Sequence, residues 1–331
     1  MEITHAVINI MDKNINSAVF SQKELPLREH LVQEYVQKIV EKFLKSECIT
    51  FGVEQSEPAL YLASDEDNFL MRAEQLTQHV FESLAGWQEV PTGDMLFIEA
   101  VDQMGANYVG MLKLDYSVKY THLVDYDDNN QVVNKIQKNE AILPAPTQAL
   151  NTGIIIKDQK TCFVRDRKYK DVQGNWSFQE NVLEVKEKQV KTSDEINAVK
   201  KALKSVAKKY DLPAYEVAAE AQTVVYEGIG NEGQINNETL AQAVFKENYT
   251  AKQEFLAELD KKEMAKQVDV TANAPIFEKK YQKQKLKLDN GIEITVPVEL
   301  LKNKDVIEFI NQEDGSLEVV LRNIDSIKNS F

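Results

Sequence analysis

Residues 112–126 read LKLDYSVKYTHLVDY, and the period-two alternation in this stretch decides the fold class. The even positions carry apolar or aromatic side chains: Leu112, Leu114, Tyr116, Val118, Tyr120, Val124 and Tyr126. The odd positions are mostly polar: Lys113, Asp115, Ser117, Lys119, Thr121 and Asp125. Successive side chains of a strand point to opposite faces, so the pattern predicts a half-buried antiparallel sheet. The polar run DYDDNNQ at 125–131 predicts a hairpin turn within it.

The flanking sequence adds further strands and two helices to this sheet. Strands are expected at 3–11, 17–25 and 48–54 before the alternating stretch, and at 132–144, 151–157 and 161–169 after it. Apolar residues recur at helical spacing over 27–44 and again over 64–84, where Ser64 is the expected cap and Gly86 the stop. The first part of the chain therefore predicts an α+β domain with helices packed on a mainly antiparallel sheet.

The chain becomes helical after residue 185. Thr192 and Glu195 have capping-box spacing at the start of a helix over 193–210, and a second helix follows Pro213 and ends at Gly228 and Gly230. Two more helices are expected over 236–245 and 250–264. The last 45 or so residues return to strands, with a turn at 313–315. The sequence thus predicts two domains: an acidic α+β domain over 1–185, and a helical region with a C-terminal β segment and Lys-rich faces over 186–331.

The charge is unevenly distributed along the chain. The whole protein carries -14, and residues 1–130 hold nine Lys and Arg against 22 Asp and Glu. Residues 131–331 hold 30 against 31, and two stretches there are locally basic: 186–209 with eight Lys against three acids, and 278–287 with five Lys against one. The net charge alone argues against a nucleic-acid partner. The uneven distribution, however, allows the basic stretches of the C-terminal half to bind one.

Two sets of lysines are the candidate DNA-binding residues. On the helix over 193–210, four lysines fall within one arc opposite the apolar stripe: Lys200, Lys201, Lys204 and Lys208. The second set lies in EKKYQKQKLK, which precedes or begins a strand: Lys279, Lys280, Lys283, Lys285 and Lys287. Each set can contact phosphates. For the helical set a solvated helix face is the favoured alternative. For the second set, protection against edge-to-edge strand pairing is as well supported as DNA contact. Both interpretations stay open.

Other chemistry is poorly supported by the residue pattern. One class of metal-dependent nucleases uses two carboxylates to hold Mg²⁺ and a lysine to position the attacking water. The chain offers the same residue types at Asp171, Glu184 and Lys186. The spacing Glu-x-Lys is, however, common by chance in a sequence rich in Lys and Glu. Residues 236–259 suit an ordinary helical hairpin better than a DNA-reading helix-turn-helix, because the second helix is acidic. We expect no catalytic residues, metal site or cofactor. Two thiols, Cys48 and Cys162, fit a reducing cytoplasm, and apolar runs are too short to span a membrane.

The chain resembles the 37-kDa bacterial nucleoid-associated protein family. The similarity rests on ITHAVINIMD at 3–12, LKLDYSVKYTHLVDYD at 112–127 and the closing stretch GIEITVPVELLKNKDVIEFINQEDGSLEVVLRNID at 291–325. The resemblance implies a non-enzymatic cytoplasmic protein of the nucleoid and a homodimer, and it supplies no catalytic residues.

Three functions follow as hypotheses. The first is sequence-nonspecific binding of double-stranded DNA through the Lys-rich C-terminal half. The second is an interaction adaptor whose acidic N-terminal domain binds a basic partner, such as a DNA-handling protein. The third is a nuclease built on Asp171, Glu184 and Lys186.

Overall fold

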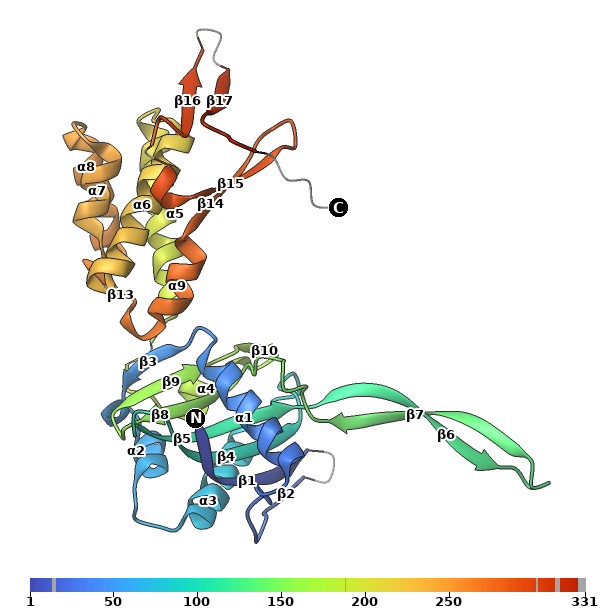
Figure 1. The fold of residues 1–331 in the computed structure, drawn as a ribbon. Helices are drawn as coiled ribbons and strands as arrows, with labels where there is room; N and C mark the ends of the chain where they lie inside the picture. The colour runs from blue at the N-terminus through green and yellow to red at the C-terminus, as the bar shows by residue number, and fades with distance from the viewer. Residues whose placement is uncertain (14–15, 188, 302, 313–315, 327–331) are drawn as a thin grey trace. The chain divides into compact units, whose positions relative to one another are not determined.

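The computed structural model describes residues 1–13, 16–187, 189–301, 303–312 and 316–326. The chain folds into two compact units, Met1–Gln189 and Val190–Phe331, and each has a hydrophobic core of its own (Figure 1). Strands predominate in the first unit, and the second combines helices with short hairpins. The α+β fold class predicted from the sequence is confirmed.

A seven-stranded sheet forms the centre of the first unit. Its strands are β1 (Glu2–Asp12), β2 (Ser17–Val19), β3 (Ile49–Gly52), β4 (Gly93–Val101), β5 (Asn107–Asp115), β8 (Gly153–Lys157) and β9 (Thr161–Arg165). Their order is β2-β1-β4-β5-β8-β9-β3, and every neighbouring pair is antiparallel. The predicted antiparallel sheet is therefore present, with Leu112 and Leu114 buried on β5.

Helices cover both faces of this sheet. They are α1 (His30–Leu44), α2 (Glu57–Ala63), α3 (Phe69–Ser83) and α4 (Phe178–Asn181), with a short 3₁₀ turn η1 (Val53–Gln55) before α2. Phe43 of α1 packs in one core with Leu96 of β4, whereas Leu76 of α3 packs in the other core with Phe97. Alternate residues of β4 thus enter opposite cores, which is why its sequence is apolar almost throughout. A small hairpin, β10 (Tyr169–Asp171) with β11 (Gly174–Trp176), completes the unit.

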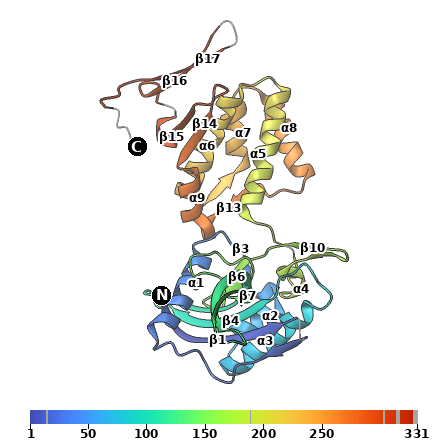
Figure 2. The ribbon, with the colours of Figure 1, turned by 90° about the vertical axis from the view of Figure 1, so that its right-hand side faces the viewer.

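The sequence prediction for the second half of the alternating stretch is wrong. The second half of the alternating stretch forms β6 (Ser117–Tyr126), which pairs with β7 (Val132–Ile142) as a separate two-stranded hairpin. Its residues are mostly exposed instead of half-buried. Figure 1 shows this hairpin extending away from the sheet, and the turned view of Figure 2 looks along it. The sheet position beside β5 is taken by β8, so the chain leaves the sheet after Asp115.

The second unit is built on packed helices. They are α5 (Thr192–Lys209), α6 (Ala214–Glu232), α7 (Asn237–Phe245), α8 (Tyr249–Lys261) and α9 (Ala274–Tyr281), with 3₁₀ turns η2 (Thr271–Asn273) and η3 (Val298–Leu300). Buried residues of all five helices share one core. Three antiparallel strand pairs accompany them. The first joins β12 (Gln234–Asn236) to β13 (Gln267–Asp269) on either side of α7 and α8, and the other two are hairpins: β14 (Lys283–Lys287) with β15 (Glu293–Pro297), and β16 (Ile307–Asn311) with β17 (Leu317–Leu321). The predicted turn at 313–315 lies outside the described residues.

Several predicted helix ends are displaced. Helix α3 begins at Phe69, where Asn68 Oδ1 accepts a hydrogen bond from the Met71 amide, and not at Ser64. The capping box at the start of α5 is wrong, because the N-cap is Lys191 and no side chain caps it. Helix α6 continues through Gly228 and Gly230 and stops only at Gly233, whose φ of 65° is the left-handed conformation that ends helices.

Candidate nucleic-acid interface

Helix α5 presents lysines on the side opposite its buried stripe. Ile196, Val199, Leu203 and Val206 enter the core of the second unit, as the spacing predicts. Lys201, Lys204 and Lys208 are exposed, whereas Lys200 is only partly exposed. The four candidate lysines of this helix therefore differ in environment, and Lys200 sits at the border between core and solvent.

The second set of lysines is divided between two elements. Lys279 and Lys280 lie in the last turn of α9, where cations interact favourably with the negative end of the helix dipole. Lys283, Lys285 and Lys287 lie on β14 and are all exposed, whereas Gln284 is buried between them. Exposed lysines therefore alternate with less exposed residues along this strand.

Helices α5 and α9 bring one lysine of each set over the same aromatic ring. The Nζ atom of Lys200 lies 4.1 Å from the centroid of the Tyr281 ring, and the Nζ atom of Lys280 lies 5.5 Å from the same centroid. A cation over an aromatic face is attracted by the ring quadrupole. Lys200 and Lys280, which are 80 positions apart, thus lie over the ring of Tyr281, and Lys204 is close enough to Lys200 to lower its pKa. We call Lys200, Lys204 and Lys280 the lysine cluster.

The electrostatics of the cluster favour an anionic ligand. Burial, together with the positive charges of Lys280 and Lys204, lowers the pKa of the Lys200 ammonium to about 8. Partial burial and like charges both disfavour the charged form of an amine. An anion placed among these ammonium groups would favour their charged forms and so offset both effects.

The lysines of β14 have mixed surroundings. Lys285 forms an ion pair with Glu293 of the neighbouring strand, with 2.6 Å between Nζ and Oε2. Lys287 lies opposite Glu293 in the register, and Lys283 lies opposite Pro297. Because β14 belongs to a two-stranded hairpin, it is an edge strand, and its lysines suit edge protection as well as phosphate contact.

The acidic helix α8 packs against other helices of the second unit. Glu254 accepts hydrogen bonds from Lys209 Nζ at 2.6 Å and from the Tyr210 hydroxyl at 2.9 Å. The rings of Phe245 on α7 and Phe255 on α8 lie 5.8 Å apart in the core. The segment 236–259 is therefore the helical hairpin favoured by the sequence, and its second helix has the wrong charge for a DNA groove.

The residues of the nuclease hypothesis have separate partners. Asp171 accepts hydrogen bonds from the backbone amides of Gln88 and Glu89, and these bonds lower its pKa. The Lys186 ammonium donates to the backbone oxygen of Glu54. Within the described ranges, no group of three or more His, Cys, Asp or Glu side chains could hold a metal ion.

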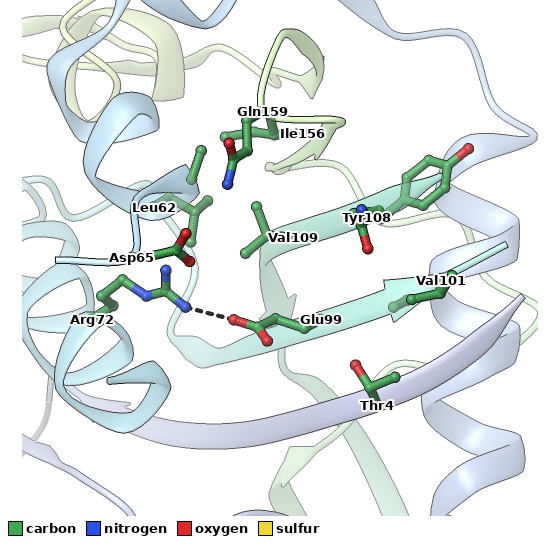
Figure 3. A pocket seen from close by; sticks show the side chains of 13 residues that line it. Thr4, Leu62, Asp65, Arg72, Glu99, Val101, Tyr108, Val109, Ile156 and Gln159 are labelled. Carbon is green, nitrogen blue, oxygen red and sulfur yellow. Dashed lines mark hydrogen bonds and ion pairs between the residues drawn. The ribbon is translucent and has the colours of Figure 1, made fainter. Parts of the chain in front are cut away.

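The first unit contains a small charged pocket that the sequence did not reveal. Figure 3 shows Arg72 of α3 reaching toward Glu99 of β4, with 2.5 Å between Nη2 and Oε1. The Arg72 side chain is only 7 % exposed, and its Nε has no hydrogen-bond partner among the residues that the structure describes. Asp65 also lines the pocket, whose volume is about 190 Å³. The pocket is an unsuitable phosphate site, because the two carboxylates beside the arginine would repel an anion.

The comparisons with known proteins give a family. A family model described as nucleoid-associated protein YejK matches residues 4–328, which is almost the whole chain. No individual curated protein matches it. Over the described residues, no helix is both long enough and apolar enough to cross a membrane.

Proposed function

Because the chain belongs to the nucleoid-associated protein YejK family, we propose that it binds double-stranded DNA without sequence specificity, through lysines of its second unit. The observation that carries the proposal is the lysine cluster. Lys200 and Lys280 come from different helices and lie over the ring of Tyr281, and Lys204 is close enough to shift the pKa of Lys200. Convergent ammonium groups match a phosphate backbone, which carries no sequence information.

The exposed lysines around the cluster extend the proposed contact. Lys201 and Lys208 continue along α5, Lys279 adjoins the cluster on α9, and Lys283, Lys285 and Lys287 follow on β14. With about six phosphate contacts in all, the affinity would fall by about three orders of magnitude between 50 and 200 mM salt. A protein of this kind would act on the nucleoid and need neither a catalytic residue nor a cofactor.

A salt series on three proteins tests the proposal. The cluster variant carries Lys200→Gln, Lys204→Gln and Lys280→Gln. The control variant carries Lys252→Gln, Lys261→Gln and Lys266→Gln, which lie on α8 or just beyond it and change the net charge equally. Binding of a DNA duplex is measured by fluorescence anisotropy at several salt concentrations.

The two variants should separate clearly. Loss of three contacts should reduce the slope of log K against log salt by about 2.7, whereas the control should keep the wild-type slope. Equal slopes in both variants would mean that net charge, and not the cluster, governs binding. A flat salt response in the wild-type protein would refute phosphate contact altogether.

An interaction adaptor is the second candidate, and the acid excess of the first unit favours it. Residues 1–189 hold 19 Lys and Arg against 29 Asp and Glu. This unit would repel DNA and attract a basic protein, such as one that handles DNA. Pull-down from nuclease-treated lysate separates the candidates, because an adaptor retains its partner when the DNA has been digested.

In either role we propose that the protein acts as a homodimer.

A further inference from the structure

The hairpin of β6 and β7 is a surface that the DNA-binding proposal leaves without a role. We call residues 117–142 the arm. Within the described residues, its two strands pair only with each other and do not join the seven-stranded sheet. Figure 1 shows the arm extending from the body of the first unit, and it begins directly after β5. An isolated two-stranded hairpin is at best marginally stable in water, so the arm needs a covering surface.

The register of the hairpin gives the arm one apolar face. Tyr126 pairs with Val132, Val124 with Asn134, His122 with Ile136 and Tyr120 with Lys138. Side chains of directly opposed residues lie on the same face, so five apolar side chains line this face: Tyr120, Val124, Tyr126, Val132 and Ile136. The opposite face is mainly polar, with Thr121 opposite Gln137, and Asp125 forming an ion pair with Lys135.

The apolar face is exposed over an unusually large area. Ile136 is 81 % exposed, Tyr120 67 % and Val132 62 %. Since a Tyr side chain buries about 150–250 Å² and an aliphatic one somewhat less, the five side chains present on the order of 500 Å² per chain. Exposed patches of this size on soluble proteins mark interaction sites.

The area of the face matches what a second copy of the chain would cover. Two such faces in contact would bury on the order of 1,000 Å² from these side chains alone, close to the roughly 1,200–2,000 Å² of a stable interface. His122, Asn134 and the aliphatic part of Lys138 lie on the same face and add to that area. A smaller partner surface would leave part of the face in water.

The charge pattern of the arm also favours a second copy. The arm holds three Lys against four acids, whereas residues 1–116 hold eight Lys and Arg against 19 acids. Two antiparallel arms would place Lys138, which forms an ion pair with Glu140 near the base of its own arm, toward the tip of the other arm, where Asp127 and Asp128 lie. The arrangement is self-complementary, as a two-fold interface requires.

The length of the arm separates the acidic bodies. A strand rises about 3.3 Å per residue, so ten residues of β6 span about 33 Å. That distance is several times the Debye length of about 8 Å at physiological ionic strength. A basic partner protein, by contrast, would be attracted to the acidic body and not to this nearly neutral, apolar face.

We propose that the apolar faces of two arms pack against each other in antiparallel orientation and form the interface of a homodimer. The inference specifies the homodimer proposed above and is independent of DNA binding. The residues at the centre of the interface are Val124 and Ile136, and Tyr120 of one chain packs near Tyr126 of its partner.

Sedimentation equilibrium on matched variants tests this interface. The test variant carries Val124→Asn and Ile136→Asn on the apolar face. The control carries Leu123→Asn and Val133→Asn, which make the same kind of change on the opposite face of the same hairpin. We expect the dimer dissociation constant to rise on the order of 100-fold in the test variant, because four apolar side chains per dimer are lost, and to stay near the wild-type value in the control.

Chemical cross-linking locates the contact independently. The native thiols, Cys48 and Cys162, are both buried, so an introduced cysteine on the arm is the accessible one. A short bismaleimide should link Val124→Cys chains into dimers but not Gln137→Cys chains, whose cysteine lies on the opposite face. If the wild-type protein is a monomer, both the homodimer and the arm interface are refuted. A dimer that survives the apolar-face substitutions, or that links through position 137, refutes the arm interface alone.

Discussion

If the protein binds DNA as proposed, the partly buried ammonium of Lys200 should make the affinity depend on pH in a range where phosphates do not titrate. Burial and two neighbouring ammonium groups lower the pKa of Lys200 to about 8. Only the protonated amine attracts a phosphate, so raising the pH through 8 should weaken binding. In the complex the phosphate stabilises the protonated form, which raises the pKa of Lys200 back toward the ordinary lysine value.

The size of the effect follows from these two pKa values. For an amine with a pKa of about 8 in the unbound protein and well above 9 in the complex, the association constant falls by about tenfold between pH 7 and pH 9, or about 1.4 kcal/mol. The assay is anisotropy of a labelled DNA duplex at constant ionic strength. Two variants at position 200 separate this amine from the other groups of the protein.

Lys200→Gln should bind more weakly at pH 7 and lose the tenfold decline. Lys200→Arg keeps a charge at every pH in the range, because a guanidinium is always protonated, and should bind about equally at pH 7 and pH 9. The same pH dependence in all three proteins would refute the role assigned to Lys200. Wild-type affinity that does not change between pH 7 and pH 9 would refute it equally.

Two further predictions concern stability. Phe255→Ala removes a fully buried ring that packs on Phe245. It should lower the free energy of unfolding of the second unit by about 3–5 kcal/mol in denaturant titrations. A change below about 1 kcal/mol would contradict the core described for this unit. Gly153→Ala should destabilise the first unit by at least about 1–3 kcal/mol in the same assay. The reason is that the φ angle of Gly153 is 152° and that a Cβ atom would lie 2.9 Å from the backbone oxygen of Met111. An unchanged free energy of unfolding would exclude that close approach.

The sequence predicts the layers of the fold better than it predicts what covers each face. Leu114 on β5 and Tyr120 on β6 belong to one continuous alternation, yet the first is buried and the second is 67 % exposed. The pattern specifies that one face of a strand is apolar, and it does not specify where the covering surface comes from. On β5 the covering surface is the core that the strand shares with α1, whereas no described residue of the chain covers the apolar face of the arm.

The lysine cluster shows a different limit of sequence reasoning. Helical spacing correctly places Lys204 and Lys208 on the solvent side of α5, because that inference needs only local geometry. The meeting of Lys200 with Tyr281 depends on how α5 and α9 pack, which no local pattern contains. The signal that was available is compositional: EKKYQKQKLK places an aromatic residue among lysines, a combination suited to cation–π contact.

The position of the charges, and not their sum, decides whether this protein can bind DNA. Residues 190–331 hold 20 Lys and Arg against 24 Asp and Glu, so even the unit that carries the lysine cluster is acidic overall. At physiological salt, charges farther than about 8 Å from a phosphate are largely screened, so in the proposed complex only the cluster and its neighbours would act on the DNA. At low salt the acidic remainder also acts and opposes binding. The plot of log affinity against log salt should therefore flatten below about 30 mM salt, where the Debye length exceeds about 17 Å, whereas a uniformly basic protein would keep a straight line.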